Sequence, residues 1–230
     1  HCRRRCCANV TITPSPRSTP RSRVSSRCSR APNKATVSEP TSSTVSHWNG
    51  VDWSPIYDGP ASGVWGDGRG TKRHTIFVVG SEGILRPRGA TWLPALSLEA
   101  QAMWGVGEDL FALGSPLQPG VVAYATDGST SFTLLPPLPP PIPMGYHAPG
   151  VRAPFGSIWA SAANDIWVSV GDLIEQHVWH WDGMSWSPST TIMGRTVALG
   201  GSGPSDIWAV GDFTTHWDGR TWSQPEPTGV

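Results

Sequence analysis

Three histidines, each followed directly by a tryptophan, are the residues of this chain best suited to binding chemistry. They occur as His47-Trp48, His180-Trp181 and His216-Trp217. An imidazole can ligate a metal ion or form a hydrogen bond, and an exposed indole face can hold a sugar ring. We therefore take His180, Trp181, His216 and Trp217 as candidate ligand contacts, on the condition that the two tryptophans are exposed. The alternative is that each histidine packs or forms a hydrogen bond beside a turn, without any ligand.

The sequence does not predict a metal site or a catalytic site. Equivalent histidines of successive repeats should be separated by the width of a repeat, so they are not expected to converge on a metal ion. The four cysteines contain no Cys-x-x-Cys pair, so zinc is not expected either; they are Cys2, Cys6, Cys7 and Cys28. The sequence has no nucleophile elbow, phosphate loop or His-Glu-x-x-His motif. We accordingly expect no catalytic residue, no metal and no cofactor.

Acidic residues support one alternative, a propeller-type glycoside hydrolase or an accessory domain of a carbohydrate-active enzyme. Glycoside hydrolysis needs two carboxyl groups at one site. Glu82, Glu99 and Glu175 fall outside the repeat pattern and are the candidates. Most other acids occupy repeated positions, where turn formation explains them; these are Asp165, Asp172, Asp182, Asp206, Asp212 and Asp218.

A recurring Asp-Gly-x-Ser/Thr-Trp pattern shows which elements must position these side chains. Its glycines recur at steps of 39, 39, 55 and 36 residues, a period typical of stacked supersecondary units. Asp-Gly predicts a tight hairpin turn, and the aromatic residue that follows predicts a core anchor. The residues assigned to this structural repeat are Gly50, Trp53, Gly89, Trp92, Gly128, Phe132, Asp182, Gly183, Trp186, Asp218, Gly219 and Trp222.

The apolar stretches between these turns predict an all-β fold, part of a β-propeller of four-stranded antiparallel blades. Each unit combines a Trp-containing strand, an apolar strand that ends in Gly, a strand that ends in His-Trp, and the Ser/Thr-Trp strand. Four whole blades are expected, at about 61–97, 101–135, 155–190 and 196–225. Residues 47–54 resemble the last two strands of a further blade. Four and a half blades do not make a ring, so we expect a longer parent chain to supply the remaining blades.

Two segments are expected to lie outside the blades. Residues 1–46 are rich in Arg, Ser, Thr and Pro with few large apolar residues, which predicts a disordered segment and places the repeat domain at 47–230. The Pro-rich insert 134–149 predicts a stiff polyproline II spacer outside the sheets. Its PxxP spacings leave open a docking role on an aromatic groove.

Charge divides the chain into two kinds of polypeptide and limits the classes of partner. Residues 1–34 hold nine of the 17 Lys and Arg and none of the 17 Asp and Glu, so the rest carries a net charge of 8 − 17 = −9. An acidic repeat body argues against a nucleic-acid groove. No apolar run reaches the ~20 residues of a membrane-spanning helix. No signal peptide is visible, although a chain that opens on His is expected to be a fragment.

The last two units resemble the tryptophan-rich propeller repeats of bacterial secreted and surface proteins, many of them lipoproteins. The resemblance rests on 205–212, Ser-Asp-Ile-Trp-Ala-Val-Gly-Asp, and on 216–223, His-Trp-Asp-Gly-Arg-Thr-Trp-Ser, and it covers about 47–225. A weaker similarity links Asp-Gly-x-x-Trp to fucose-binding propeller lectins. These resemblances imply a non-enzymatic extracellular or cell-surface module that binds a glycan or a protein. A purely structural platform for protein–protein contacts is the other alternative.

Overall fold

The computed structural model describes residues 10–14, 43–48, 51–66, 76–114, 120–126, 131–139, 155–171, 174–194 and 196–227. Every regular element among them is a β-strand. The chain divides into two compact units, His1–Ala61 and Ser62–Val230. The domain boundary predicted from composition falls between residues 46 and 47. This position lies within strand β2 (Ser43–Trp48).

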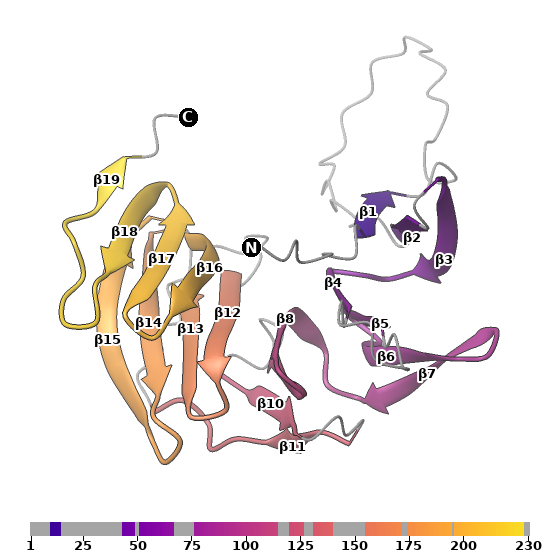
Figure 1. Cartoon of the computed structure of the whole chain (residues 1–230), viewed down its shortest axis with the longest axis horizontal. Helices are drawn as coiled ribbons and strands as arrows, with labels where there is room; N and C mark the ends of the chain where they lie inside the picture. Colours follow the sequence, from indigo (N-terminus) through magenta and orange to yellow (C-terminus); the bar gives the residue numbers. More distant parts are fainter. Residues whose placement is uncertain are drawn as a thin grey trace, which may run out of the picture. The chain divides into compact units, whose positions relative to one another are not determined.

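The second unit consists of four antiparallel sheets, each with its four strands in chain order, and this confirms the four predicted blades (Figure 1). Blade 1 contains β4 (Gly63–Gly66), β5 (Ile76–Gly80), β6 (Gly83–Arg88) and β7 (Thr91–Leu96). Blade 2 contains β8 (Ala100–Val106), β9 (Asp109–Gly114), β10 (Val122–Ala125) and β11 (Thr133–Leu134). Blade 3 contains β12 (Phe155–Ala162), β13 (Asp165–Gly171), β14 (Glu175–Trp181) and β15 (Trp186–Met193). Blade 4 contains β16 (Thr196–Gly203), β17 (Asp206–Gly211), β18 (Phe213–Trp217) and β19 (Glu226–Pro227).

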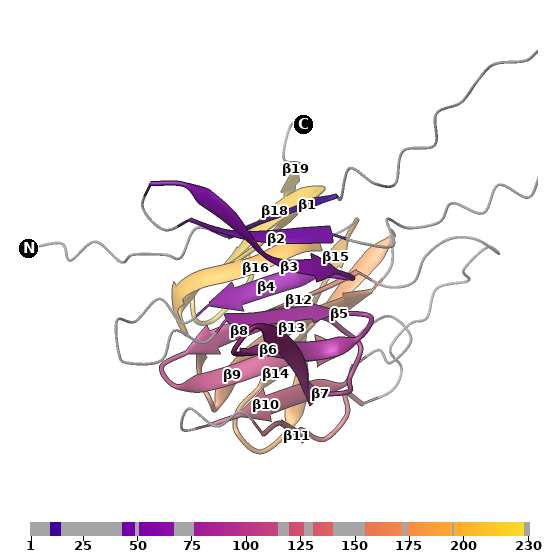
Figure 2. The same ribbon diagram turned by 90° about the vertical axis from the view of Figure 1, so that its right-hand side faces the viewer.

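The first strands of the blades lie side by side and bring the sheets around a common axis. Strand β8 contacts both β4 and β12, and β12 also contacts β16. The other strands of each blade follow outward in sequence, as the adjacent strands β8, β9 and β10 show in Figure 2. First strands at the centre of radiating meanders define a β-propeller. The fold class predicted from the sequence is therefore confirmed.

Tryptophans of the first strands fasten each blade to the next one. The indole Nε1 of Trp104 in blade 2 donates a hydrogen bond of 2.9 Å to the carbonyl oxygen of Ala160 in blade 3. Trp65 of blade 1 lies against Gly105, where a Cβ atom would overlap its ring. Trp159 of blade 3 lies in the same way over Gly201 of blade 4. The small residues at these places allow an indole ring to cross the neighbouring strand.

The repeat aromatic residues of blades 2 to 4 make a second contact, directed at the preceding blade. Trp222 donates a 2.9 Å hydrogen bond from Nε1 to Oγ of Ser189 in blade 3. Trp186 donates a 2.8 Å bond to the carbonyl oxygen of Pro136, which follows the last strand of blade 2. Phe132 of blade 2 packs edge-on against Phe77 of blade 1, with ring centroids 6.1 Å apart. The anchoring role predicted for these residues is therefore a role between blades.

Three apolar clusters fill the spaces between successive blades. The second strands of blades 1 to 3 supply much of them, since both faces of β5, β9 and β13 are covered; in β13, all residues from Ile166 to Gly171 are buried. This explains why the second strands are continuous apolar runs rather than alternating ones.

The Pro-rich insert differs from its prediction at the residues that the structure describes. Leu134 belongs to β11, and Leu138 is buried in the cluster between blades 2 and 3. The amide of Leu135 donates to the carbonyl of Val122 at 2.8 Å, and that of Leu138 to the carbonyl of Gly120 at 3.2 Å. Leucines between the prolines keep their amide donors and apolar side chains, so 135–138 is hydrogen-bonded to blade 2 and packs at its interface with blade 3, although it forms no strand. The rest of the insert lies outside the described residues.

The first unit contains one antiparallel sheet of three strands, β1 (Val10–Pro14), β2 and β3 (Trp53–Gly59). Strands β2 and β3 form the expected hairpin, although it is longer than the predicted 47–54. Strand β1 pairs with the other edge of β2, where the prediction left the blade incomplete. Disorder was therefore wrongly predicted for Val10–Pro14 and 43–46, because Val-Thr-Ile-Thr is a short run of strong strand formers within a polar segment. The other residues of 1–42 lie outside the described part.

Candidate functional site

A network of four side chains occupies the start of the second strand in blade 3. Asp165 accepts hydrogen bonds from Oγ of Ser161, from Nε1 of Trp167 at 2.8 Å and from Nε2 of His180 at 2.8 Å. The His180 ring also stacks on the Trp167 ring, with centroids 4.3 Å apart and planes 25° apart. The backbone explains this proximity, because Trp167 and His180 are register partners on β13 and β14.

The same network recurs in blade 4. Asp206 accepts from Oγ of Ser202, from Nε1 of Trp208 at 3.1 Å and from Nε2 of His216 at 2.8 Å. His216 stacks on Trp208 with centroids 4.3 Å apart and planes 24° apart. The sequence Ser-x-x-x-Asp-x-Trp, followed by His in the next strand, therefore specifies one recurring arrangement.

Hydrogen bonds lower the pKa of both aspartates below the ordinary value. Burial alone would raise the pKa of Asp165, but the bonds from His180, Ser161 and Trp167 outweigh it, and the result is a lowered pKa. The bonds from Ser202 and His216 lower the pKa of Asp206. Both carboxyl groups are therefore ionised acceptors near neutral pH.

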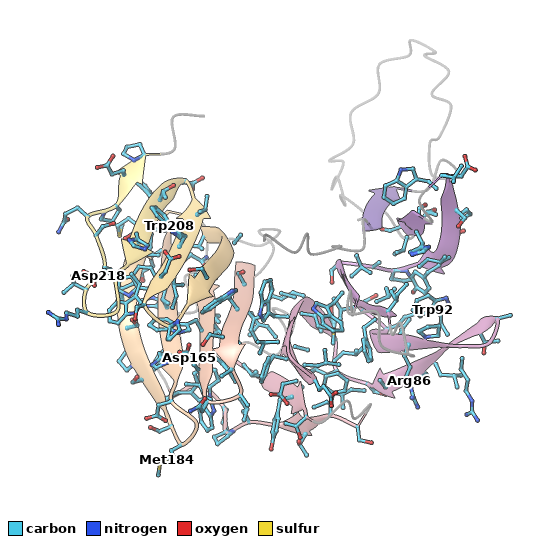
Figure 3. The ribbon with its side chains drawn as sticks, in the orientation of Figure 1. Arg86, Trp92, Asp165, Met184, Trp208 and Asp218 are labelled. Atoms are coloured by element: carbon cyan, nitrogen blue, oxygen red, sulfur yellow. The ribbon has the colours of Figure 1, made fainter. Side chains whose placement is uncertain are left out.

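Blades 1 and 2 hold different residues at the places of the Trp–His pair. Phe111 and Tyr124 are register partners in blade 2. In blade 1, the register pairs Val78 with Leu85, and the residues next to this pair are Phe77 and Arg86, which Figure 3 labels. The complete network is thus confined to blades 3 and 4 among the described blades.

The two networks differ greatly in exposure. Trp167 of blade 3 is 2% exposed, whereas Trp208 of blade 4 is 44% exposed (Figure 3). Trp217 and Trp222 of blade 4 cover Trp167, with ring centroids 5.5 and 5.9 Å from it. Trp208 therefore presents an aromatic surface beside Asp206 and His216, whose side chains are 45% and 30% exposed.

The four predicted ligand contacts have different environments. His180 and His216 belong to the two networks, in keeping with the alternative of a hydrogen-bonded histidine beside a turn. Trp181 is a core residue, and its ring centroid lies 5.4 Å from that of Trp186. It does not meet the condition of exposure and is therefore withdrawn as a candidate ligand contact. Trp217 is half-buried, covers Trp167, and donates from Nε1 to the carbonyl oxygen of Pro204 at 3.1 Å. Residue alternation did not reveal this, because neighbouring blades decide which face of a strand is covered.

Turn residues of the structural repeat close the outer hairpins. Oδ1 of Asp182 accepts from the amides of Met184 and Ser185, each at 2.8 Å, and these bonds lower the pKa of Asp182. Oδ1 of Asp218 accepts in the same way from the amides of Arg220 and Thr221, each at 2.8 Å, with the same effect on its pKa. The glycines of these turns have the positive φ that favours glycine, 94° at Gly183, 93° at Gly219 and also 64° at Gly89.

The remaining repeat residues are placed as follows. Trp92 is half-buried, and Trp53 is 47% exposed. Gly50 and Gly128 lie outside the described residues.

Trp208 is the surface residue that sequence reasoning missed. Because Trp208, like Trp167, lies in an apolar second strand, the sequence predicted that it belongs to the core between the sheets. The sequence around Trp208 gives no signal of this exposure, because it is nearly identical to that around the buried Trp167.

The serines of these two networks are not arranged as activated nucleophiles. Ser161 and Ser202 each donate to an aspartate instead of a histidine, so the histidine does not activate the hydroxyl. A hydroxyl–imidazole–carboxylate row does occur on the outer strands of blade 3, where Nδ1 of His177 lies 3.0 Å from Oγ1 of Thr191, and its Nε2 lies 3.3 Å from Oε1 of Glu175. Thr191 is the cross-strand register partner of His177, which accounts for their contact without a catalytic role.

The described part of the chain contains no group of three or more His, Cys, Asp or Glu residues that could hold a metal ion. Its residues also include no helix long and apolar enough to cross a membrane.

Comparison with known proteins returns structural similarity only. No protein-family profile and no curated protein sequence matches the chain. Among solved structures, the extracellular domain of the hybrid two-component system BT4673 of B. thetaiotaomicron is 9% identical, with a TM-score of 0.46 over 74% of this chain and 22% of that one. YCF48 from Cyanidioschyzon merolae is 17% identical, with a TM-score of 0.44 over 68% of this chain and 53% of that one. The N-terminal domain of Nup159 is 9% identical, with a TM-score of 0.43 over 82% of this chain and 56% of that one. The chain thus spans between about a fifth and just over half of these structures.

Proposed function

We propose that this protein is a non-enzymatic extracellular binding or scaffold module, and that blade 4 provides its interaction surface. The observation that carries the proposal is the exposed indole of Trp208, in a place where the equivalent Trp167 is buried. Exposed aromatic surface beside a few polar groups is typical of ligand sites. The residues proposed to contact a ligand are Trp208, His216 and Trp217, together with the carboxylate of Asp206.

A glycan is the small-ligand class that fits this chemistry. The apolar face of a sugar ring packs on an indole, and its hydroxyl groups form hydrogen bonds with carboxylates and imidazoles. Asp206 and His216 lie within hydrogen-bond distance of each other, at 2.8 Å, and both are partly exposed beside Trp208. A site on the surface of this kind suits a secreted or cell-surface protein, as do the tryptophan-rich, often lipoprotein repeats that the sequence resembles.

The hydrolase alternative is the weaker one, because its candidate carboxylates are distributed over separate blades. Glu82 lies in the turn between β5 and β6 of blade 1, and Glu99 directly precedes β8 of blade 2. Glu175 begins β14 of blade 3, where it contacts His177. The most regular acids, Asp165, Asp182, Asp206 and Asp218, accept hydrogen bonds that support turns and networks.

A glycan array probed with the full chain tests the glycan-binding form of the proposal. Trp208→Ala should reduce binding to any captured glycan at least about tenfold, because an indole platform supplies a large share of the contact area. Met184→Ala is the matched control, since Met184 lies at the tip of the β14–β15 hairpin and is 86% exposed (Figure 3). Equal losses in both variants would contradict the assignment to blade 4. No glycan binding by the wild type would leave the protein–protein platform, which a pull-down with the full chain would test.

A further inference from the structure

Blade 1 is the basic part of an acidic repeat body. Residues 61–97 hold five Lys and Arg against two Asp and Glu, a net charge of 5 − 2 = +3. Residues 98–230 hold three against twelve, a net charge of 3 − 12 = −9. Two of the five basic residues, Arg86 and Arg88, lie on strand β6, and their side chains point to the same side of it because they are two residues apart. Blade 1 therefore carries two neighbouring cations among few carboxylates.

Arg86 occupies the place that a histidine holds in the complete networks of blades 3 and 4. Phe77 and Arg86 lie next to a register pair of β5 and β6, where blades 3 and 4 hold the tryptophan and the histidine (Figure 3). In those blades the histidine binds a carboxylate two residues before the tryptophan, that of Asp165 or Asp206. The residue two before Phe77 is Thr75, which lies outside the described residues but whose type excludes a carboxylate. A cation has thus replaced the imidazole, and the repeat supplies no anion for it.

The guanidinium group of Arg86 is partly buried without a partner. Its Nε is buried and lacks a hydrogen-bond partner, and Arg86 is the one charged side chain among the described residues with such an atom. Arg86 also takes part in none of the ion pairs of the described residues. The residue as a whole is partly exposed. Burying part of a cation costs free energy unless a negative charge compensates for it, so this arrangement favours a bound anion.

Arg88 replaces an aspartate at the first position of the turn that follows β6. Asp182 and Asp218 hold this place in blades 3 and 4, where their carboxylates accept hydrogen bonds from turn amides. Arg88 has an exposed side chain, and its carbonyl oxygen accepts a 3.0 Å hydrogen bond from Oγ1 of Thr91 across the turn. The edge that carries two aspartates in each of blades 3 and 4 therefore carries two arginines in blade 1.

We propose that Arg86 and Arg88 form an anion subsite on blade 1, which binds the carboxylate or sulfate group of an acidic oligosaccharide. A guanidinium group forms paired, charge-assisted hydrogen bonds with such oxyanions. The bound anion offsets the cost of the partly buried cation, and Arg88 adds a second positive charge on the same side of the strand. The glycan class of the ligand rests on the proposed function, whereas the charged subsite is separate from the surface on blade 4.

Isothermal titration calorimetry of the full chain with two pairs of trisaccharides tests the subsite. Trigalacturonate carries carboxylates that its methyl ester lacks, and sulfated maltotriose carries sulfates that maltotriose lacks. The wild type should bind at least one acidic probe at least about tenfold more tightly than its uncharged counterpart, and more weakly as the salt concentration rises. Binding of one acidic probe and not the other identifies the group that the subsite takes.

Substitutions locate the binding on blade 1. Arg86→Gln should weaken binding of the acidic probe at least about tenfold, because it removes both the charge and the paired donors. Arg86→Lys keeps the charge without the planar pair of donors, so it should recover only part of the affinity. Arg88→Gln should weaken binding roughly two- to threefold, since an exposed charge is screened.

Arg220→Gln is the matched control, because Arg220 is an exposed arginine in the corresponding turn of blade 4. It should bind the acidic probe like the wild type. Thermal unfolding without ligand should show that Arg86→Gln remains folded, since the buried Nε of Arg86 has no hydrogen bond to lose.

Three results would overturn the inference. They are a wild type that binds neither acidic probe, binding that Arg86→Gln leaves unchanged, as for an anion held by the basic residues 1–34, and equal losses in Arg86→Gln and Arg220→Gln. Binding of an uncharged glycan that depends on Trp208, without binding of either acidic probe, would remove the subsite and leave the proposed function in place. Binding of an acidic probe that depends on Arg86, without any binding that depends on Trp208, would support the subsite and remove the assignment to blade 4.

Discussion

Replacing Asp165 by alanine should destabilise the fold far more than the same change at Asp206, although the two residues accept the same set of hydrogen bonds. The side chain of Asp165 is 14% exposed and that of Asp206 is 45% exposed. Their tryptophan donors differ even more, since Trp167 is buried between blades and Trp208 is exposed. Water can therefore replace the lost acceptor in blade 4, whereas in blade 3 it cannot reach the buried indole N–H of Trp167.

The expected loss for Asp165→Ala follows from the donors that remain. The indole N–H of Trp167 loses its partner in a buried place, which costs about 1–3 kcal/mol. Ser161 and His180 also lose a charged acceptor but can turn toward water, because the side chain of His180 is 28% exposed. A total of about 2–3 kcal/mol is expected, which corresponds to a fall in Tm of roughly 5–10 °C for a chain of this size.

Urea and thermal unfolding of the two alanine variants, with Asp165→Asn as a third, measure these losses. Asparagine keeps an acceptor oxygen for Trp167, and its amide can donate to the Ser161 hydroxyl, so it should lose less than half as much stability as alanine. A loss in Asp206→Ala as large as that in Asp165→Ala would refute the role assigned to burial. So would an Asp165→Ala variant whose Tm falls by less than about 2 °C.

Two further predictions concern pH and packing between blades. Because hydrogen bonds lower the pKa of Asp165 in the folded state, its ionised form stabilises the fold above the unfolded-state pKa of about 3.9, and this contribution is lost as the pH falls through the folded-state value. The difference in urea midpoint between wild type and Asp165→Asn should therefore be full at pH 6 and shrink below about pH 4; a difference that grows on acidification would contradict this sign. Gly105→Ala should cost about 1–3 kcal/mol, because the new methyl group would overlap the ring of Trp65, whereas Gly200→Ala should be close to neutral because its surroundings are open. Thermal unfolding of the two variants checks this, and equal shifts in Tm would contradict the packing described for Gly105.

The blades could be predicted from the sequence because their signals are local. Asp-Gly turns, apolar strands that end in glycine and aromatic residues at fixed offsets recur within about 40 residues, and each reports on one strand or turn. The strand Val10–Pro14 was missed because its partner, β2, lies some 30 residues further along a polar segment. Leu138 was missed for a related reason, since its proline neighbours mask an apolar side chain that only a tertiary contact buries.

The candidate site was harder to predict, because exposure depends on what covers a strand and not on the strand itself. Trp167 and Trp208 occupy the same place in nearly identical sequences, Asp-Ile-Trp-Val and Asp-Ile-Trp-Ala, yet one is buried and the other is exposed. The hydrogen bonds of His180 and His216 likewise depend on the register between second and third strands. The residue types alone predicted an imidazole beside a turn. The Ser–Asp–Trp–His network could be recognised only once the pairing of the strands was known.

The contacts between blades also determine how the second unit should unfold. Each blade holds its two neighbours through different residues, a first-strand tryptophan such as Trp159 toward the next blade and a turn-side aromatic such as Trp222 toward the previous one. The free energy of unfolding is then a sum of terms for the individual blades and for the interfaces between neighbouring blades. Unfolding is therefore cooperative only across the interfaces that remain intact. Blades 2 and 3 have described interfaces on both sides, and their amide hydrogens should exchange last. Blade 4 leaves the apolar side chains of Trp208 and Val210 exposed, so its amide hydrogens should exchange earlier than those of blades 2 and 3.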